Sequence, residues 1–259
     1  PPGHRGGSEG CGAGGGVGVV DRGRASGRGD LTVLANSGLA ATFGLNDRTG
    51  TGNSSLTVRG DVSVGTGGAL VLGCVPNSFP CFDDLNQGSP TLSSAGHVGG
   101  SLVAMMADGV IVHNSTIGGD VKQSGGGAGL TCDPAGFFAN FGSPAYSDYE
   151  DSTVRGSISI SNMNGCWLGL ARDNIGGDLS IHNNQFADPD AIEILSDTIK
   201  GDLICRSNSM VWDSADLSAT GELWPRLPEP NTVRGERKGQ CNTLANPSTQ
   251  GGTPGPQPF

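Results

Sequence analysis

Aromatic and charged residues are scarce in this chain: of its 259 residues, 5% are aromatic and 15% are charged. So few large side chains cannot fill the wide core of an ordinary globular domain. They can fill the thin core of a repeat array, because each repeat contributes only a few inward residues. Basic residues are fewer than acidic ones, 15 against 25, and the net charge of −10 excludes a nucleic-acid-binding surface. No apolar run approaches the roughly 18 residues of a membrane-spanning helix, so we expect no membrane span.

Helical periodicity is also nearly absent. No window keeps apolar residues at i, i+3, i+4 and i+7 for longer than two turns, and the 46 glycines oppose helix formation. A strict six-residue period, which is typical of left-handed β-helices, is missing as well. These absences leave another kind of β structure as the expected fold.

The chain does contain a short motif that recurs about eight times: an aliphatic residue, any residue, Gly, a small acid or Ser, and a second aliphatic residue. The copies lie at 27–31, 58–62, 98–102, 117–121, 154–158, 175–179, 199–203 and 233–237, and the first and last are imperfect. Apolar residues alternate after the motif, as at Leu179 and Ile181, which is the pattern of half-buried strands. The recurrence therefore predicts a stacked array of β repeats.

The spacing between motif glycines runs from 19 to 40 residues. We read the short intervals, 19 to 24 residues, as single coils, and the long ones as two coils or as one coil with an excursion. The segment 60–72, with two alternating pairs around a Gly turn, favours two coils. We predict an all-β, right-handed parallel β-helix at 27–242, with a flexible Gly-rich arm at 1–26 and a Pro/Gly-rich tail at 243–259. Three excursions are expected at 73–95, 124–150 and 209–230.

This pattern resembles the parallel β-helix superfamily that includes pectate lyases and many bacterial surface proteins. The segments 199–208 and 231–241 are more closely similar to the ends of uncharacterised secreted proteins of actinobacteria. That resemblance implies secretion and a disulfide between Cys205 and Cys241. It implies no activity.

Seven cysteines suit an oxidising, extracellular compartment. Their positions suggest three pairs, although six cysteines allow 15 connectivities: Cys74–Cys81, Cys132–Cys166 and Cys205–Cys241. Cys11 remains. It either forms a bond to another subunit or is a free thiol. Alternatively, it pairs within the chain and another cysteine is free. A zinc site is disfavoured because no Cys-x2-Cys pair exists and only 4 His are present. Because the chain opens on Pro1 and Pro2, we expect a processed, secreted protein.

The acids of the repeat motif should stack along one edge of the array, about 4.8 Å apart. The candidate metal ligands among them are Asp61, Asp120, Asp178 and Asp202. We expect them to point outward, to accept backbone N–H bonds with Gly providing the turn, or to share a cation such as Ca²⁺. The structural role is the expected one, and no cofactor is expected. Asn162, Asn183 and Asn208 also recur after the motif and predict an Asn ladder.

Aromatic residues gather in two of the excursions and are the candidate contact surface. They are Phe137, Phe138, Phe141, Tyr146 and Tyr149 in one, and Trp212 and Trp224 in the other. Either the first loop buries its own rings against the array, or the rings form an interface for a protein or a glycan.

An enzyme would need convergent acids or a His base. The only candidate residues for an active site are Asp83, Asp84, His97 and the acids at 148–151. The motifs around them match neither a lyase nor a hydrolase of this superfamily. His113 and His182 lie beside strands and are expected to be solvated. We therefore assign no catalytic residue and expect no enzyme.

The expected function is that of a secreted structural protein at the cell surface, which binds copies of itself through its arms and end coils to form a filament or layer. The exposed strand edges at both ends of a β-helix favour this hypothesis, because they must be capped or used. The alternatives are a β-helix that binds or cleaves polysaccharides and an adhesin-like surface module.

Overall fold

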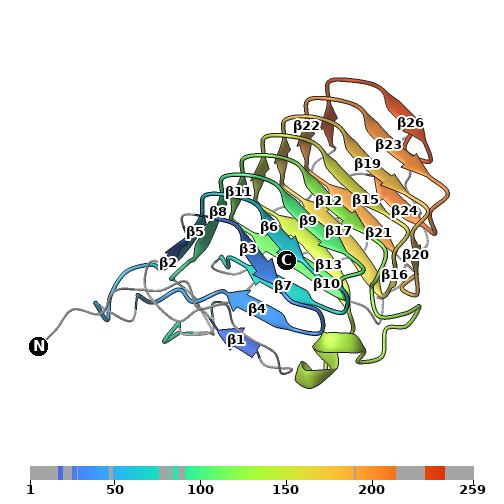
Figure 1. Cartoon of the computed structure of the whole chain (residues 1–259). Helices are drawn as coiled ribbons and strands as arrows, with labels where there is room; N and C mark the ends of the chain where they lie inside the picture. Colours follow the sequence, from blue (N-terminus) through green and yellow to red (C-terminus); the bar gives the residue numbers. More distant parts are fainter. Residues whose placement is uncertain are drawn as a thin grey trace, which may run out of the picture.

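In the computed structural model, almost every described element is a β-strand, and the strands form three long parallel sheets (Figure 1). The structure describes residues 17–19, 25–27, 29–46, 49–75, 81, 84–86, 91–189, 191–213 and 231–242. Cys11, Asp83, Trp224, the side chain of Trp212 and the tail at 243–259 lie outside the described residues.

The three large sheets have eight strands each. Sheet A contains β1 (Val17–Val19), β4 (Gly38–Ala41), β7 (Ala69–Leu72), β10 (Gly109–His113), β13 (Tyr146–Glu150), β17 (Trp167–Ala171), β21 (Ile192–Leu195) and β24 (Val211–Asp213). Sheet B contains β2 (Ala25–Gly27), β5 (Ser55–Val58), β8 (Ala95–Val98), β11 (Thr116–Ile117), β14 (Thr153–Val154), β18 (Asn174–Ile175), β22 (Thr198–Ile199) and β25 (Thr232–Val233). Sheet C contains β3 (Leu31–Val33), β6 (Val62–Val64), β9 (Leu102–Met105), β12 (Val121–Ser124), β15 (Ile158–Ser161), β19 (Leu179–His182), β23 (Leu203–Arg206) and β26 (Arg237–Gly239).

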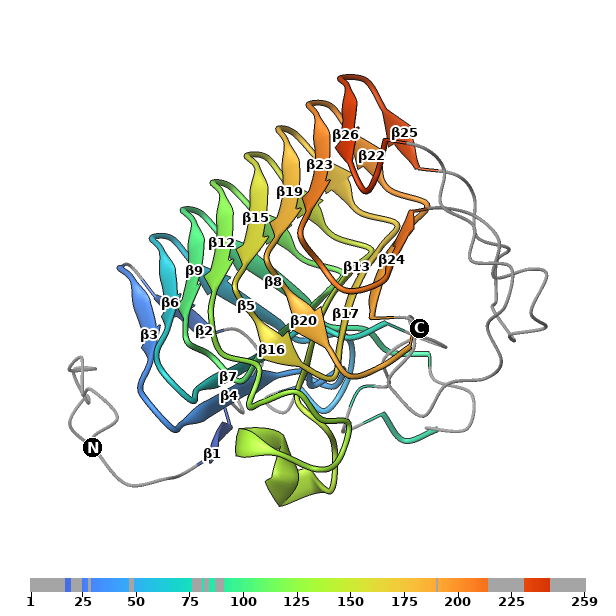
Figure 2. The same cartoon turned by 90° about the vertical axis from the view of Figure 1, so that its right-hand side faces the viewer.

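The chain visits sheets A, B and C in turn, and we call one such passage a coil. Each coil adds one strand to every sheet, so neighbouring strands within a sheet come from consecutive coils (Figure 2). Two further strands, β16 (Asn164–Gly165) and β20 (Gln185–Phe186), pair with each other, and one 3-10 helix, η1 (Gly136–Phe141), lies between β12 and β13.

Every described motif copy ends at the start of a sheet C strand, so each interval between motif glycines contains a single coil. The prediction of two coils around 60–72 is wrong. Its two alternating pairs belong to β6 in sheet C and β7 in sheet A of the next coil, because the chain turns from one sheet to the other between them. The long intervals are long because of excursions.

Three predicted segments also need correction. β1 and β2 pair with β4 and β5, so the sheets already begin within the segment 1–26 that was predicted as an arm. β13 belongs to sheet A and β24 pairs with β21, so the predicted excursions at 124–150 and 209–230 both include strands.

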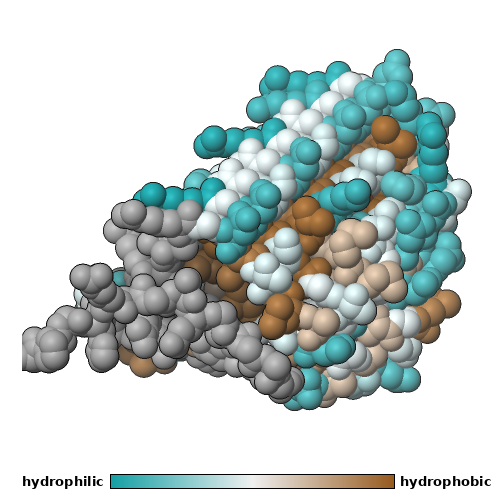
Figure 3. All heavy atoms as spheres, in the orientation of Figure 1, coloured by the Kyte–Doolittle hydropathy of each residue, from teal (hydrophilic) through white to brown (hydrophobic). Residues whose placement is uncertain are grey.

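Equivalent residues of successive coils stack into columns, and the inward columns form the core. One column of sheet C consists of Val62, Leu102, Val121, Ile158, Leu179 and Leu203, each at most 1% exposed. Fully burying one such side chain stabilises the fold by roughly 1.5–3 kcal/mol. Rows of similar hydropathy run along the surface of the stack for the same reason (Figure 3).

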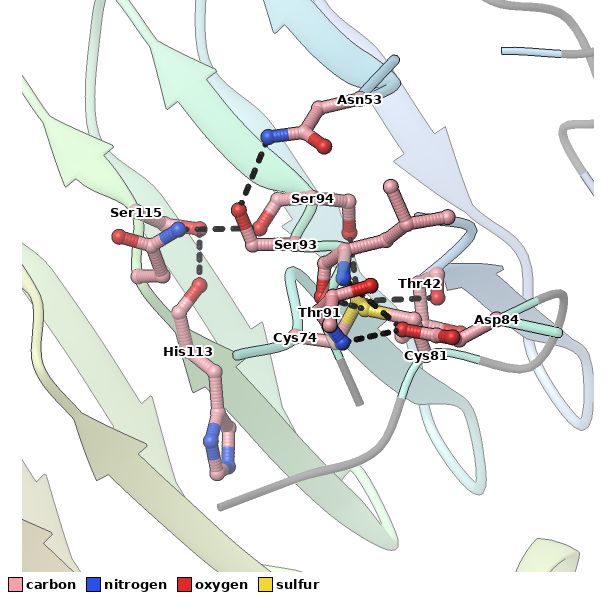
Figure 4. Close-up of a disulfide and its surroundings, with 12 residues drawn as sticks. Thr42, Asn53, Cys74, Cys81, Asp84, Thr91, Ser93, Ser94, His113 and Ser115 are labelled. Carbon is pink, nitrogen blue, oxygen red and sulfur yellow. Dashed lines mark hydrogen bonds between the residues drawn. A yellow bond between two sulfur atoms is a disulfide. The ribbon is translucent and has the colours of Figure 1, made fainter. Parts of the chain in front are cut away.

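All three predicted cysteine pairs are within disulfide distance, with Cα–Cα separations of 5.4 Å for Cys74–Cys81, 4.6 Å for Cys132–Cys166 and 5.4 Å for Cys205–Cys241. The first closes a loop between β7 and β8 (Figure 4). The other two each join residues from neighbouring coils. None of the helices that the structure describes is long and apolar enough to cross a membrane.

Candidate functional site

The motif acids form a ladder along the outside of the stack. Its rungs are Asp30, Asp61, Ser101, Asp120, Ser157, Asp178, Asp202 and Glu236, which we call the repeat ladder. The side-chain oxygen of each rung before Glu236 accepts a hydrogen bond from the backbone N–H of the next rung, one coil further on. The Asp61 carboxylate, for example, accepts from the N–H of Ser101 at 2.7 Å, and the Ser101 hydroxyl accepts from the N–H of Asp120 at 3.1 Å. Serine therefore continues the ladder where the acid is missing.

The ladder also explains the glycine of the motif. A Cβ on Gly156 would collide with the Asp120 carboxylate, and one on Gly177 would collide with the Ser157 hydroxyl. These glycines do not have positive φ, so the expectation that Gly provides a special turn conformation is wrong. Gly is required because the preceding rung lies against its Cα.

The four candidate metal ligands, Asp61, Asp120, Asp178 and Asp202, are thus each occupied as acceptors through one oxygen. Among the residues that the structure describes, they do not gather into a group of three metal ligands. Asp202 also forms an ion pair with Lys238, and hydrogen bonds from the N–H of Glu236 and from Lys238 hold its pKa below the usual carboxyl range.

The aromatic excursion folds back over the outer face of sheet A. The rings form a chain of contacts, with centroid separations of 5.7–6.1 Å, in the order Phe141, Phe137, Phe138, Tyr146 and Trp167. Phe137 lies against Gly38 of β4 and Phe138 against Gly109 of β10, and both views show η1 beside the N-terminal coils (Figures 1 and 2).

The five aromatic residues of the excursion that were predicted as a contact surface differ in how far they are buried. Phe138 and Tyr146 are buried beneath the excursion, and Tyr149 belongs to the core, where its hydroxyl donates to Gln123. Phe137 is partly buried, and Phe141 is 61% exposed. Three of the five are therefore unavailable to a partner, and the loop buries most of its own rings.

A cluster of charged side chains lies on the outer side of sheet A, and we call it the buried charge cluster. Its members are His113 from β10, Asp148 and Glu150 from β13, and Asp151 and Arg172 from the corners that follow β13 and β17. In the register of β10 and β13, His113 is opposite Glu150 and Ile111 is opposite Asp148. The imidazole therefore lies between two carboxylates of the adjacent strand.

The contacts within the cluster are short. His113 Nε2 is 3.1 Å from Asp148 Oδ2, and His113 Nδ1 is 3.9 Å from Glu150 Oε2. Arg172 donates to both oxygens of Asp151 and to Glu150 Oε2, each at 2.8 Å. The side chains of His113, Asp148 and Glu150 are 0% exposed.

Burial dominates the protonation of this cluster. Desolvation lowers the pKa of His113 below its ordinary value, although the neighbouring charges of Glu150 and Asp151 oppose the shift. Desolvation raises the pKa of Asp148 to about 7. Desolvation also lowers the pKa of Arg172, but its bonds to Asp151 and Glu150 outweigh that effect, so its pKa is raised overall.

A second buried ladder runs beside the cluster, at the start of the sheet B strands. Asp173 Oδ1 accepts from the N–H of Ser152 at 2.8 Å, Asp197 Oδ1 from the N–H of Asp173 at 2.7 Å, and Asn231 Oδ1 from the N–H of Asp197 at 2.8 Å. Burial, followed by the charge of Asp197, raises the pKa of Asp173 well above the usual carboxyl range.

The sequence pointed to only part of this site. It named the acids at 148–151, but His113 was expected to be solvated, and that prediction is wrong because the outer face of sheet A is covered at this point. Asp84 lies elsewhere and accepts three backbone N–H bonds in the segment between Cys81 and β8, while the His113 imidazole points away from the Cys74–Cys81 disulfide (Figure 4). His97 is on the exposed side of β8. Arg172 carried no sequence signal, since no motif marks the corner where it lies.

No protein-family model matches this chain, and neither a curated protein nor a solved structure matches it. The geometry of the molecule is therefore the basis for any functional assignment.

Proposed function

We propose that the chain is a right-handed parallel β-helix and a secreted structural subunit that assembles head to tail into a filament. The observation that carries this proposal is the state of the two end strands of sheet C. Among the described residues, β3 pairs only with β6 and β26 pairs only with β23. Open parallel edges of this kind are templates for a further strand.

The backbone groups at the two edges are complementary. Leu31 N–H donates to Asp61, and the carbonyl of Val33 accepts from Gly65, so the groups of Thr32 point away from β6. Leu203 N–H donates to the carbonyl of Glu236, and Gln240 N–H donates to Cys205, so the N–H groups of Arg237 and Gly239 point away from β23. A second copy placed with its β3 on β26 would continue the same bonding pattern.

The repeat ladder supports the same arrangement. Its last rung, Glu236, has a side chain that is 77% exposed, and its first rung, Asp30, is exposed. If a second copy extends the stack, its Asp30 N–H meets the Glu236 carboxylate as every earlier rung meets the one before it. The contact does not close on itself, so repetition gives a filament.

The proposal that the protein is secreted rests on the three disulfides, because disulfides persist in oxidising compartments. The exposed and acidic character of the repeat ladder suits a structural role in solvent. No described feature favours a catalytic function over this one.

The experiment compares Arg237→Pro with Arg237→Ala by sedimentation velocity and negative-stain electron microscopy. Both variants lose the arginine side chain, but only Pro removes the outward N–H of β26. We expect filaments or large oligomers from the wild type and Arg237→Ala, and at least a tenfold weaker association of Arg237→Pro. Monomers from the wild type, or equal assembly of the two variants, would refute head-to-tail stacking.

A further inference from the structure

The second position of the repeat motif indicates a binding surface on sheet B. In all eight copies this position holds Arg, Lys or Gly, although acids outnumber bases in the chain by 25 to 15. Four of these bases are described and exposed, and we call them the basic row: Arg59, Arg155, Lys200 and Arg234. We propose that the basic row and the polar face of sheet B beside it bind a linear acidic polysaccharide that lies along the stack. This surface is separate from the strand edges that the proposed function uses.

Glycine occupies the second position where the backbone leaves no room for a side chain. A Cβ on Gly99, Gly118 or Gly176 would collide with the carbonyl oxygen of the second-position residue one coil earlier. The other four described copies all carry a base. A position that only had to be solvated would accept Glu, Gln, Ser or Thr as readily as Arg or Lys. The recurrence therefore indicates a requirement for positive charge.

The bases of the row are available to a ligand. In the described part of the chain, their side chains form no ion pair and no hydrogen bond. The acids of the repeat ladder lie beyond the motif glycine, and they turn an oxygen along the stack toward a backbone N–H, as Asp120 does toward Ser157. They do not pair with the basic row. Because they still repel anions, they favour a ligand that lies over sheet B rather than over sheet C.

A row of polar side chains runs beside the basic row, two residues earlier in each coil. Side chains two residues apart along an extended chain point to the same side, so both rows are on the outer face of sheet B, where β5, β8 and β11 run side by side (Figure 1). The strand register stacks this polar row in the order Thr57, His97, Thr116, Thr153, Asn174, Thr198 and Thr232. Hydroxyl, amide and imidazole groups donate and accept hydrogen bonds, and so match the hydroxyl groups of sugars.

The spacing of the bases fits a polymer that runs along the stack. Arg234 follows Lys200 by one coil, and Lys200 follows Arg155 by two. Because neighbouring strands are about 4.8 Å apart, these steps are about 5 and 10 Å. The sugars of an extended polysaccharide follow one another at a spacing similar to that of the coils, so charged groups on neighbouring or alternate sugars can meet successive bases. Arg binds such carboxylate groups through two N–H donors.

The test measures the binding of polyglucuronate to the full chain by titration calorimetry at low salt, with neutral dextran and inorganic polyphosphate as comparison ligands. We expect the wild type to bind polyglucuronate, to release it as the salt concentration rises, and not to bind dextran. The double variant Arg155→Gln/Lys200→Gln removes two charges from the basic row and should weaken binding about 10-fold or more. Lys122→Gln/Arg206→Gln, the matched control, removes the same charge from exposed positions of sheet C and should bind like the wild type.

Thr153→Val/Thr198→Val separates the recognition of sugars from the attraction of charges, because it keeps every charge and removes two hydroxyl groups of the polar row. We expect it to weaken polyglucuronate binding and to leave unchanged any binding of polyphosphate, which contains no sugar. Circular dichroism confirms that each variant has folded. The proposal would be overturned if the wild type did not bind polyglucuronate, or if the basic-row and control variants lost affinity equally. Polyphosphate binding as tight as that of polyglucuronate, with no effect of the threonine substitutions, would also overturn it, since charge attraction alone would then explain the binding.

Discussion

At the scale of single residues, each side chain must pack and hydrogen-bond with the equivalent positions one coil before and one coil after it. Asn is well suited to a ladder position because its oxygen accepts an N–H while its amide donates. Asn231 does both, accepting from Asp197 N–H and donating to the carbonyl of Ile194. Asn208 does the same with Asn184 N–H and the carbonyl of Ile181. An ionised Asp can only accept hydrogen bonds, so a buried Asp at such a position destabilises the folded state unless it is protonated.

Asp173 occupies the same ladder as Asn231, two coils earlier, and we predict that Asp173→Asn stabilises the protein at neutral pH. Its amide is expected to donate to the carbonyl of Tyr149, the equivalent of Ile194. Because the folded state raises the pKa of Asp173, it binds that proton more tightly than the unfolded state does. The wild type therefore loses stability as the pH rises above the usual carboxyl pKa of about 3.9.

The variant lacks this loss, so it should exceed the wild type by about 1–3 kcal/mol at pH 7 and by much less at pH 4. Urea unfolding at both pH values measures the difference. Asp178→Asn, which makes the same exchange on the exposed repeat ladder, is the control for the loss of a carboxylate that is not buried. A destabilised Asp173→Asn at pH 7 would mean that the carboxylate is ionised and held by its surroundings.

The motif glycine gives a second test at this scale. Gly156→Ala places a methyl group against the Asp120 carboxylate and the backbone of Gly119, whereas Gly29 has nothing within 4 Å of its Cβ position. We expect Gly156→Ala to cost about 1–3 kcal/mol of unfolding free energy, measured in urea, and Gly29→Ala to be nearly neutral. Equal effects of the two substitutions would show that the glycines serve the backbone conformation instead.

At the scale of elements, the excursion between β12 and β13 is fixed to sheet A by the Cys132–Cys166 disulfide and by buried rings. Asp108 also accepts the N–H of Phe137 at 2.6 Å and so anchors the start of η1. The excursion is thus a packed cover for the N-terminal part of the outer face of sheet A.

Because the excursion packs against sheet A, substitutions of two neighbouring phenylalanines should affect the unfolding free energy very differently. Phe138→Ala should lower the unfolding free energy by about 3–5 kcal/mol, because the ring fills the space between Gly109 and Tyr146. Phe141→Ala should change it by less than about 0.5 kcal/mol, because that side chain is 61% exposed. Thermal and urea unfolding of the pair provide the measurement, and a large cost at Phe141 would indicate an interface on that surface.

The comparison of sequence with structure is clearest for the elements. The motif predicted the β repeats, because a Gly followed by an acid or Ser recurs wherever one coil stacks on the next. The Asn ladder was predicted one residue out of phase: Asn162 and Asn183 adopt positive φ at a corner, while Asn184 occupies the ladder with Asn208. The buried charge cluster was largely missed, since only the stacking register brings His113 and Arg172 to the acids, and no local pattern encodes that register.

At the scale of the whole molecule, the described strands of each coil pair only with strands of the neighbouring coils, so stability is close to a sum of coil and interface terms. Among the described residues, the last coil has a neighbour on one side only, and its described part includes three short strands, β24, β25 and β26. The Cys205–Cys241 bond joins this coil to the one before it, and both sulfur-bearing side chains are buried. The disulfide therefore stabilises an end that packing alone holds weakly.

We predict that replacing both Cys205 and Cys241 by Ala opens the end of the stack without unfolding the centre. Closing a loop of 36 residues is worth about 3–4 kcal/mol of chain entropy. Hydrogen exchange should show β25 and β26 losing protection by a factor of about 100 or more, while β12 and β15 retain theirs. Since β26 is the edge on which a second copy is proposed to stack, the same variant should also assemble poorly. Uniform loss of protection along the chain would instead mean that the stack unfolds as one cooperative unit.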